Sequence, residues 1–210
     1  MKLGTDITMF IIGITGGSGA GKTSALRALQ TFGAKVLDCD ELYHKILSDN
    51  GQMKAGLEER FTGVLVDGVI DRKRLGGIVF NDAQALADLN KLTHKYIGRE
   101  TTLIIKQWEE QGARVAAIDA IALLQSRIAD VCNVTVGVLA PMEKRIARIM
   151  KRDTITREKA ILRINAQMPD GFYEENCDYI LMGDNEKSEE FEEKCKCLFK
   201  RILEEHKIIF

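Results

Sequence analysis

Residues 16–23 read Gly-Gly-Ser-Gly-Ala-Gly-Lys-Thr, a composition and spacing typical of a loop that binds phosphate groups. The fixed positions of the pattern G-x-x-x-x-G-K-[ST] fall on Gly16, Gly21, Lys22 and Thr23. Glycines let the backbone turn sharply, so that several N–H groups converge on one phosphate. In this pattern the lysine reaches the β- and γ-phosphates, and the threonine hydroxyl ligates Mg²⁺. The segment therefore predicts a nucleoside triphosphate site. Its expected contacts are Gly17, Ser18, Gly19, Ala20, Gly21, Lys22, Thr23 and Ser24.

Three aspartates stand directly after apolar runs that are short enough to be strands. Asp38 and Asp40 follow residues 35–37, and Asp119 follows residues 114–118. A carboxylate at the end of a parallel strand lies at the edge of the sheet where ligands bind. We expect Asp38 or Asp40 to accept the proton of an attacking hydroxyl group, and Asp119 to hold Mg²⁺ through water. The alternative for each aspartate is that it caps the helix that follows.

Basic residues gather in a predicted helix near residue 148. Arg148 and Arg152 are four residues apart, so both can face the same side of that helix. Their guanidinium groups would neutralise charge that develops on a transferring phosphoryl group. A solvated basic face is the alternative for Arg145, Lys151 and Arg157, and it is favoured for the last two.

The elements that must position these groups alternate between strands and helices. Residues 9–14 form an apolar run typical of a buried parallel strand, and apolar residues then recur at helical spacing from Ala25 to Phe32, with Gly33 as the stop. This order places a phosphate at the positive end of the helix, and it argues against a glycine-rich turn that binds nothing. Further strands are expected at 35–37, 114–118, 133–139 and 178–181. The alternation predicts an α/β fold, namely a P-loop NTPase core whose five-stranded parallel sheet lies between helices.

Two helical insertions are expected within a single domain that spans residues 9–210. The first, at about 41–112, would form a cap over an acceptor, and the second, at about 142–168, would form a lid over the nucleotide. Kinases need such parts to exclude water. A regulatory GTPase would carry an Asn-Lys-x-Asp motif, and the sequence has none. Within the first insertion we predict turns at 62–71 and helices at 41–47, 53–61, 72–80, 82–93 and 96–111.

The composition narrows the class of protein. The formal net charge of −1 over 210 residues argues against a dedicated nucleic-acid binder. Five cysteines with no C-x-x-C spacing resemble neither a disulfide framework nor a zinc site, and reduced thiols suit the cytoplasm. We find no apolar run of membrane length and no signal peptide, and we expect residues 1–8 to be a loose extension before the first strand. A soluble, cytoplasmic monomer or small homo-oligomer is expected.

From Ile11 to about Leu203 the chain resembles the dephospho-coenzyme A kinase family. The segment from Ile11 through the glycine loop is similar to that family's first strand and loop, and residues 32–40, with their Asp-x-Asp, to its second strand. Residues 68–80 and Leu92-Thr-His94 resemble its cap. The family's lid is matched by Arg152-Asp153, Thr156-Arg-Glu158, Arg163 and Ala166-Gln167.

The resemblance implies an enzyme that uses ATP and Mg²⁺. The implied reaction transfers the γ-phosphoryl group to the ribose 3′-hydroxyl of dephospho-coenzyme A. Asp40 matches the family's proposed base, with Asp38 as rival or supporting carboxylate, and Lys22 and Arg148 as the other catalytic groups. Arg74 and His94 are implied to hold the acceptor.

The chain departs from the family pattern at three places. Residues 121–124 read Ile-Ala-Leu-Leu where the family has Pro-Leu-Leu, and Lys95 stands where it has proline. Met182-Gly183 replaces an Asp-Asn pair that recurs here at residues 184–185. The first two affect the acceptor pocket and the third affects the adenine contacts. A kinase for another nucleoside or nucleotide therefore stays open, as does a non-catalytic ATP-binding regulator.

Overall fold

The computed structural model describes residues 9–183 and 188–208 of the chain, which fall into two compact units. Of the described residues, the first unit contains 9–37, 105–183 and 188–208, and the second contains 38–104. The expected N-terminal extension, residues 1–8, lies outside the described residues. None of the described helices is both long enough and apolar enough to cross a membrane.

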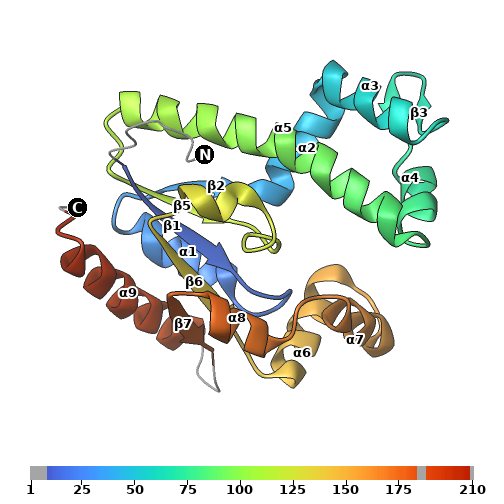
Figure 1. Cartoon of the computed structure of the whole chain (residues 1–210). Helices are drawn as coiled ribbons and strands as arrows, with labels where there is room; N and C mark the ends of the chain where they lie inside the picture. The colour runs from blue at the N-terminus through green and yellow to red at the C-terminus, as the bar shows by residue number, and fades with distance from the viewer. Residues whose placement is uncertain (1–8, 184–187, 209–210) are drawn as a thin grey trace. The chain divides into compact units, whose positions relative to one another are not determined.

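A five-stranded parallel sheet forms the centre of the first unit (Figure 1), which confirms the predicted fold class. Its order is β2–β5–β1–β6–β7, so the strand that leads into the glycine loop is the middle one. Two strands, β1 and β6, are buried at every position, which is why they read as unbroken apolar runs. The strands are β1 (Phe10–Thr15), β2 (Lys35–Asp38), β5 (Val115–Asp119), β6 (Val134–Leu139) and β7 (Tyr179–Met182).

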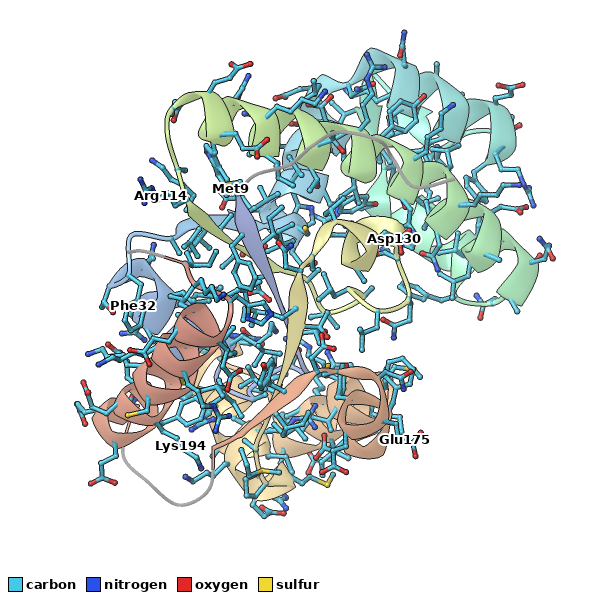
Figure 2. All side chains as sticks on the ribbon, turned by 60° about the vertical axis from the view of Figure 1, so that its left-hand side comes forward. Met9, Phe32, Arg114, Asp130, Glu175 and Lys194 are labelled. Carbon is cyan, nitrogen blue, oxygen red and sulfur yellow. The ribbon has the colours of Figure 1, made fainter. Side chains whose placement is uncertain are left out.

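Side chains and backbone groups fix the register where the strands begin. Phe10 N–H donates a hydrogen bond of 2.9 Å to the carbonyl of Arg114, and Figure 2 shows Arg114 close to Met9. Asn133 extends the pairing of β6, because its Oδ1 accepts from Ile11 N–H at 2.7 Å and its own N–H donates to Ile11 O at 2.8 Å. Because these contacts fix the register of the strands, they also fix which residues lie at the carboxyl ends of the strands. Asp119 is one of these residues.

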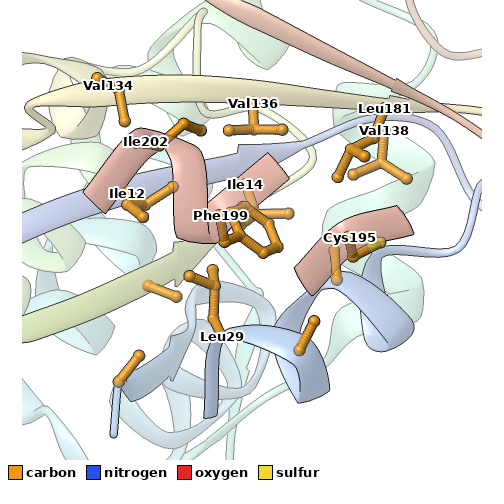
Figure 3. Packing of buried hydrophobic residues seen from close by; sticks show 14 of the residues in the cluster. Ile12, Ile14, Leu29, Val134, Val136, Val138, Leu181, Cys195, Phe199 and Ile202 are labelled. Atoms are coloured by element: carbon orange, nitrogen blue, oxygen red, sulfur yellow. The ribbon is translucent and has the colours of Figure 1, made fainter. Parts of the chain in front are cut away.

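Two helices, α1 (Lys22–Gln30) and α9 (Ser188–Glu205), pack against each other and against the sheet. Figure 3 shows Phe199 of α9 in one apolar cluster with Ile14 of β1 and Leu29 of α1, and none of the three is exposed to solvent. Full burial of each such side chain stabilises the fold by about 1.5–3 kcal/mol. The outer face of α9 is charged, as at Lys194 (Figure 2). The helix thereby supports α1, whose first turn carries Lys22.

The segment between β6 and β7 contains three helices. They are α6 (Met142–Asp153), α7 (Arg157–Asn165) and α8 (Asp170–Asn176). A small core of Ile146, Ile149, Ala160 and Ile164 joins α6 to α7. Thr156 caps α7 because its hydroxyl accepts a hydrogen bond from the backbone N–H of Lys159. A 3₁₀ helix, η1 (Arg127–Val131), precedes β6.

The second unit is mostly helical. The segment expected to hold only turns contains a hairpin, β3 (Leu65–Val66) with β4 (Val69–Ile70). The two predicted helices that flank His94 are one continuous helix, in which the Thr93 hydroxyl donates a hydrogen bond of 2.8 Å to the Leu89 carbonyl one turn earlier. The helices are α2 (Cys39–Asp49), α3 (Gly51–Arg60), α4 (Arg72–Val79) and α5 (Ala83–Glu110), of which α5 ends in the first unit.

Candidate active site

The glycine loop joins β1 to α1 and leaves no room for side chains at several of its positions, among them Gly16 and Gly19. Gly16 has φ 133° and Gly19 has φ 77°, values that disfavour any residue with a Cβ. A Cβ at Gly16 would overlap with the carbonyl of Val138, and one at Gly19 would lie 2.7 Å from the carbonyl oxygen of Arg145. Gly21, which has no side chain to cap the helix, occupies the N-cap position of α1. The start of α1 can therefore present its N–H groups to an anion.

A pocket of about 320 Å³ lies over this loop. It gathers residues from the loop, from the end of β5, from α6 and from the start of α9. All the residues expected to contact the triphosphate line it except Ser18, together with two residues of α9 that the sequence did not indicate. The lining residues are Gly17, Gly19, Ala20, Gly21, Lys22, Thr23, Ser24, Asp119, Arg148, Arg152, Ser188 and Phe191.

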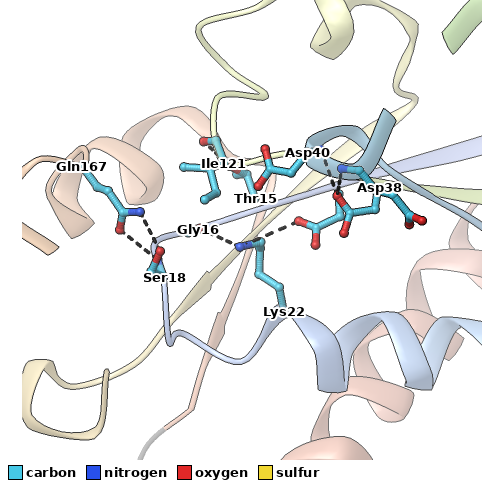
Figure 4. Close-up of polar contacts among 10 residues, drawn as sticks. Thr15, Gly16, Ser18, Lys22, Asp38, Asp40, Ile121 and Gln167 are labelled. Atoms are coloured by element: carbon cyan, nitrogen blue, oxygen red, sulfur yellow. Dashed lines mark hydrogen bonds and ion pairs between the residues drawn. The ribbon is translucent and has the colours of Figure 1, made fainter. Parts of the chain in front are cut away.

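Lys22 and Asp119 meet on one side of this pocket. The Lys22 ammonium donates a hydrogen bond of 3.2 Å to the Gly16 carbonyl and lies 3.8 Å from Asp119 Oδ1 (Figure 4). Asp119 ends β5, and the next helix along the chain is η1, which begins eight residues further on. The alternative role of Asp119 as a helix cap is therefore wrong. Thr23 is exposed toward the pocket, so a hydroxyl and a carboxylate are both available to a hard cation.

Two arginines of α6 line the same pocket, as their spacing predicted. Arg148 donates from Nη1 to the carbonyls of Gly19 and Ala20, at 2.9 and 3.1 Å. Arg152 forms two hydrogen bonds with the Asp153 carboxylate, at 2.8 and 2.9 Å. This pairing raises the pKa of Arg152 and lowers that of Asp153. Arg148 is thus held on the loop itself, and Arg152 stands at the rim with its carboxylate partner.

Arg145 is buried, so the alternative of a solvated basic face does not describe it. It is only 5% exposed and donates from Nε to the Ser18 carbonyl at 3.0 Å. Its other nitrogens bond to Asp170 and Gln167, each at 3.2 Å. A signal was available in the sequence, since Arg145 lies four residues before the buried Ile149 and so on the same face of α6. Lys151 is exposed, and Arg157 pairs with Glu143 at the surface.

The second unit holds the aspartates expected to act on the acceptor. Asp38 Oδ1 accepts from the backbone N–H groups of Asp40 and Glu41, at 2.8 and 3.1 Å, and so caps α2 (Figure 4). Asp40 is exposed in the first turn of the same helix. Asp38 therefore caps α2, as its alternative role predicted. The catalytic roles of Asp38 and Asp40 stay predictions.

The two residues implied to hold the acceptor lie on different helices of the second unit. Arg74 of α4 is exposed, with Nε 3.2 Å from Asp71 Oδ2 and Nη1 donating to the Gly63 carbonyl. His94 of α5 is half-buried, and this burial lowers its pKa. Asp184 and Asn185, which could replace the family's adenine-contacting pair, lie outside the described residues.

Known proteins resemble this chain over nearly its whole length. A sequence model of the family described as dephospho-CoA kinase matches residues 10–189. A dephospho-CoA kinase of Dehalococcoides mccartyi is 32% identical over 200 residues, which make up 93% of this chain and 99% of that protein. One of Latilactobacillus sakei is 32% identical over 197 residues, or 93% and 95% of the two chains. The crystal structure of TT1252 from Thermus thermophilus has a TM-score of 0.76 at 29% identity and covers 94% of this chain and 97% of its own. These matches confirm the resemblance on which the expectations rest, and the chain belongs to the dephospho-CoA kinase family.

Proposed function

We propose that this protein transfers the γ-phosphoryl group of ATP to the ribose 3′-hydroxyl of dephospho-coenzyme A, giving coenzyme A and ADP. One observation supports this most strongly: a single pocket is lined by the glycine loop, Lys22, Asp119 and two arginines of α6, in a chain of this family. A phosphoryl-transfer enzyme needs many donors and cations around the triphosphate, because its catalysis is mainly positioning and charge stabilisation.

Different residues of the pocket bind the phosphates, neutralise their charge and hold Mg²⁺. Backbone N–H groups at the start of α1 hold the phosphates, and the Lys22 ammonium neutralises the β- and γ-phosphates. Arg148 and Arg152 offset the negative charge on the oxygens of the transferring γ-phosphoryl group and on the leaving β-phosphate oxygen, which takes the electron pair of the bond that breaks. The Thr23 hydroxyl and, through water, the Asp119 carboxylate suit Mg²⁺, which prefers a few oxygen ligands from the protein beside the phosphates. When bound, the ion offsets phosphate charge and orients the γ-phosphoryl group.

A carboxylate of α2 accepts the proton of the attacking hydroxyl. Asp40 is the better candidate because Asp38 Oδ1 already accepts two backbone hydrogen bonds, whereas Asp40 is exposed. A base within hydrogen-bond reach of the ribose hydroxyl makes it a stronger nucleophile as attack proceeds. Arg74 and His94 hold other parts of the acceptor in this proposal. The free cysteines of the chain suit the reducing cytoplasm, where we place the reaction.

A coupled ADP-release assay with Mg-ATP, run with and without dephospho-coenzyme A, tests the proposal. We expect ADP release that depends on the acceptor, and coenzyme A as the product identified by mass spectrometry. Lys22→Ala, assayed in parallel, controls for contaminating kinases. Folded protein that binds ATP but releases no ADP with this acceptor would overturn the proposal. Turnover with another nucleoside or nucleotide would then reveal a related kinase, and its absence with every acceptor would favour an ATP-binding regulator.

A further inference from the structure

Ser18 is the one predicted triphosphate contact that does not line the pocket, and its three polar groups are all bonded to residues from beyond β6. Its backbone N–H donates to Gln167 Oε1 at 2.8 Å, and its hydroxyl accepts from Gln167 Nε2 at 2.9 Å. Its carbonyl accepts from Arg145 Nε at 3.0 Å. Figure 4 shows the amide of Gln167 facing Ser18 with both of its polar atoms. Because Ser18 is only 8% exposed, these bonds are shielded from water.

The partners of Ser18 are themselves fixed. Arg145 Nη2 donates to the same Gln167 Oε1, and its Nη1 donates to Asp170 Oδ1, both at 3.2 Å. The Arg145 side chain is 6% exposed, and its charge is compensated by the Asp170 carboxylate, whose side chain is 43% exposed, and by neutral acceptors. Arg145 lies on α6, where the chain leaves the sheet, and Gln167 lies between α7 and α8, where it returns. Both ends of the α6–α7 segment therefore meet at one serine of the loop.

Hydrogen bonds to the carbonyl groups of the glycine loop set the direction of its N–H groups, which are the groups that can bind phosphate. The carbonyls of Ser18, Gly19 and Ala20 each accept a hydrogen bond from Arg145 or Arg148. In a planar trans peptide the N–H of the following residue points away from the carbonyl. Holding the carbonyls of Ser18 and Ala20 on α6 therefore directs the N–H groups of Gly19 and Gly21 to the opposite side, and both of these glycines line the pocket.

We propose that Gln167 and Arg145 are positioning residues for ATP, which act through Ser18 and not by contact with the nucleotide. They hold the glycine loop in its phosphate-binding shape, and they make that shape depend on the α6–α7 segment. The packing around the loop agrees with this role, since a Cβ at Gly17 would overlap with Arg145 Nη2 and lie 2.9 Å from Gln167 Oε1. The inference rests on ATP as the ligand of the loop, as in the proposed function, but it does not depend on the identity of the acceptor.

Gln167→Met tests the proposal, because methionine has a similar length and cannot make the polar contacts of the amide. We expect the Kd for ATP, measured by calorimetry without acceptor, to rise about tenfold, since two hydrogen bonds that shape the loop are lost. Amide exchange at Ser18 should become about tenfold faster, because its N–H loses its acceptor. The KM for dephospho-coenzyme A should change less than about twofold. A variant that was only less stable would not weaken ATP binding while it left the acceptor KM nearly unchanged. Gln30→Met, the same change at an exposed position of α1, should leave all three values unchanged.

Ser18→Ala provides a milder second variant that removes only the hydroxyl. In a double-mutant cycle, Ser18→Ala should weaken ATP binding in the wild type and have little further effect in Gln167→Met, because the two groups act as a pair. An ATP Kd within about twofold of wild type in Gln167→Met, or additive effects in the cycle, would overturn the proposal. Because the Kd and the exchange rate need no acceptor, both can be read even if dephospho-coenzyme A is not turned over.

Discussion

The ammonium nitrogen of Lys22 lies 3.8 Å from Oδ1 of Asp119, and the two side chains are only 14% and 16% exposed. Lys22 comes from the first turn of α1 and Asp119 from the last residue of β5, so the sheet and its first helix bring opposite charges together. A second bond, from the same ammonium to the Gly16 carbonyl, directs the lysine along the loop. The charge needed for a triphosphate is thus already oriented by the protein itself, which lowers the cost of ordering the side chain on binding.

The Lys22→Ala variant should lose most of its activity. Removing the ammonium takes away the positive charge that the proposed function assigns to the β- and γ-phosphates, and loss of a comparable electrostatic group lowers kcat by about 100-fold or more. The measurement is steady-state ADP release together with the ATP Kd, with Lys35→Ala on the exposed side of β2 as the matched control. Near-normal turnover in Lys22→Ala would contradict the assignment of the loop.

Asp119→Asn should raise the requirement for magnesium. The amide keeps the size of the side chain but loses the negative charge that, in the proposed function, would hold a hydrated Mg²⁺ ion. We expect the Mg²⁺ concentration for half-maximal activity to rise about tenfold, while metal-free ATP binds no more weakly than in the wild type. Titration of Mg²⁺ at saturating ATP measures the first, and calorimetry in EDTA the second. An unchanged Mg²⁺ dependence would show that this carboxylate serves only to orient Lys22.

Local patterns predicted the parts of the site that lie close together in the sequence. The glycine spacing, the apolar strand before it and the aspartate at the end of β5 could each be predicted from a few residues, because backbone geometry and strand period are local properties. The bond between Ser18 and Gln167 joins residues 149 positions apart, and no local rule reports it. The burial of Arg145 depends in the same way on Asp170 and on the loop, so the sequence of α6 alone left open whether this arginine faces solvent.

The sequence analysis missed helix α8 and divided helix α5, again because it had only local patterns to use. Helix α8 has seven residues, too few for a clear apolar period, and its one buried side chain is Tyr173. Helix α5 was divided at His94 because the polar residues there broke the pattern, yet the continuous backbone hydrogen bonds of a long helix outweigh such a local interruption.

The roles of Asp38 and Asp40, at the start of α2, can be separated by three substitutions. Asp40→Asn should lower kcat by about 100-fold or more with little change in ATP binding, because the shape is kept and the base is lost. Asp38→Asn should retain the cap, since asparagine caps helices well, whereas Asp38→Ala should lose about 1 kcal/mol of stability. Turnover and urea denaturation of the three variants measure both effects. If Asp38→Asn loses turnover and Asp40→Asn does not, the roles are reversed.

Two half-hidden thiols should resist alkylation. Burial raises the pKa of Cys132 to about 12 and that of Cys177 to about 11, and it is the thiolate that reacts. At pH 8 we expect iodoacetamide to modify the exposed Cys197 first, with Cys132 and Cys177 reacting roughly 100-fold more slowly. Peptide mapping over time measures the order, and urea-unfolded protein, in which all the cysteines should react together, is the control. Early modification of Cys132 would contradict the described packing.

Burial of His94 should make the stability of the protein depend on pH in the acid range. Its pKa in the folded protein is lowered from the ordinary value of 6.5, so between the two values the unfolded chain binds more protons than the folded one. The free energy of unfolding therefore falls as the pH drops from about 6.5 through the lowered pKa, and above 6.5 the histidine contributes no slope. His94→Gln should lose less stability than the wild type between pH 7 and pH 5.5, as measured by urea denaturation at each pH. His44→Gln, at an exposed position of α2, should follow the wild-type curve. Parallel curves for His94→Gln and the wild type would mean that the imidazole is protonated as readily in the folded protein as in the unfolded chain.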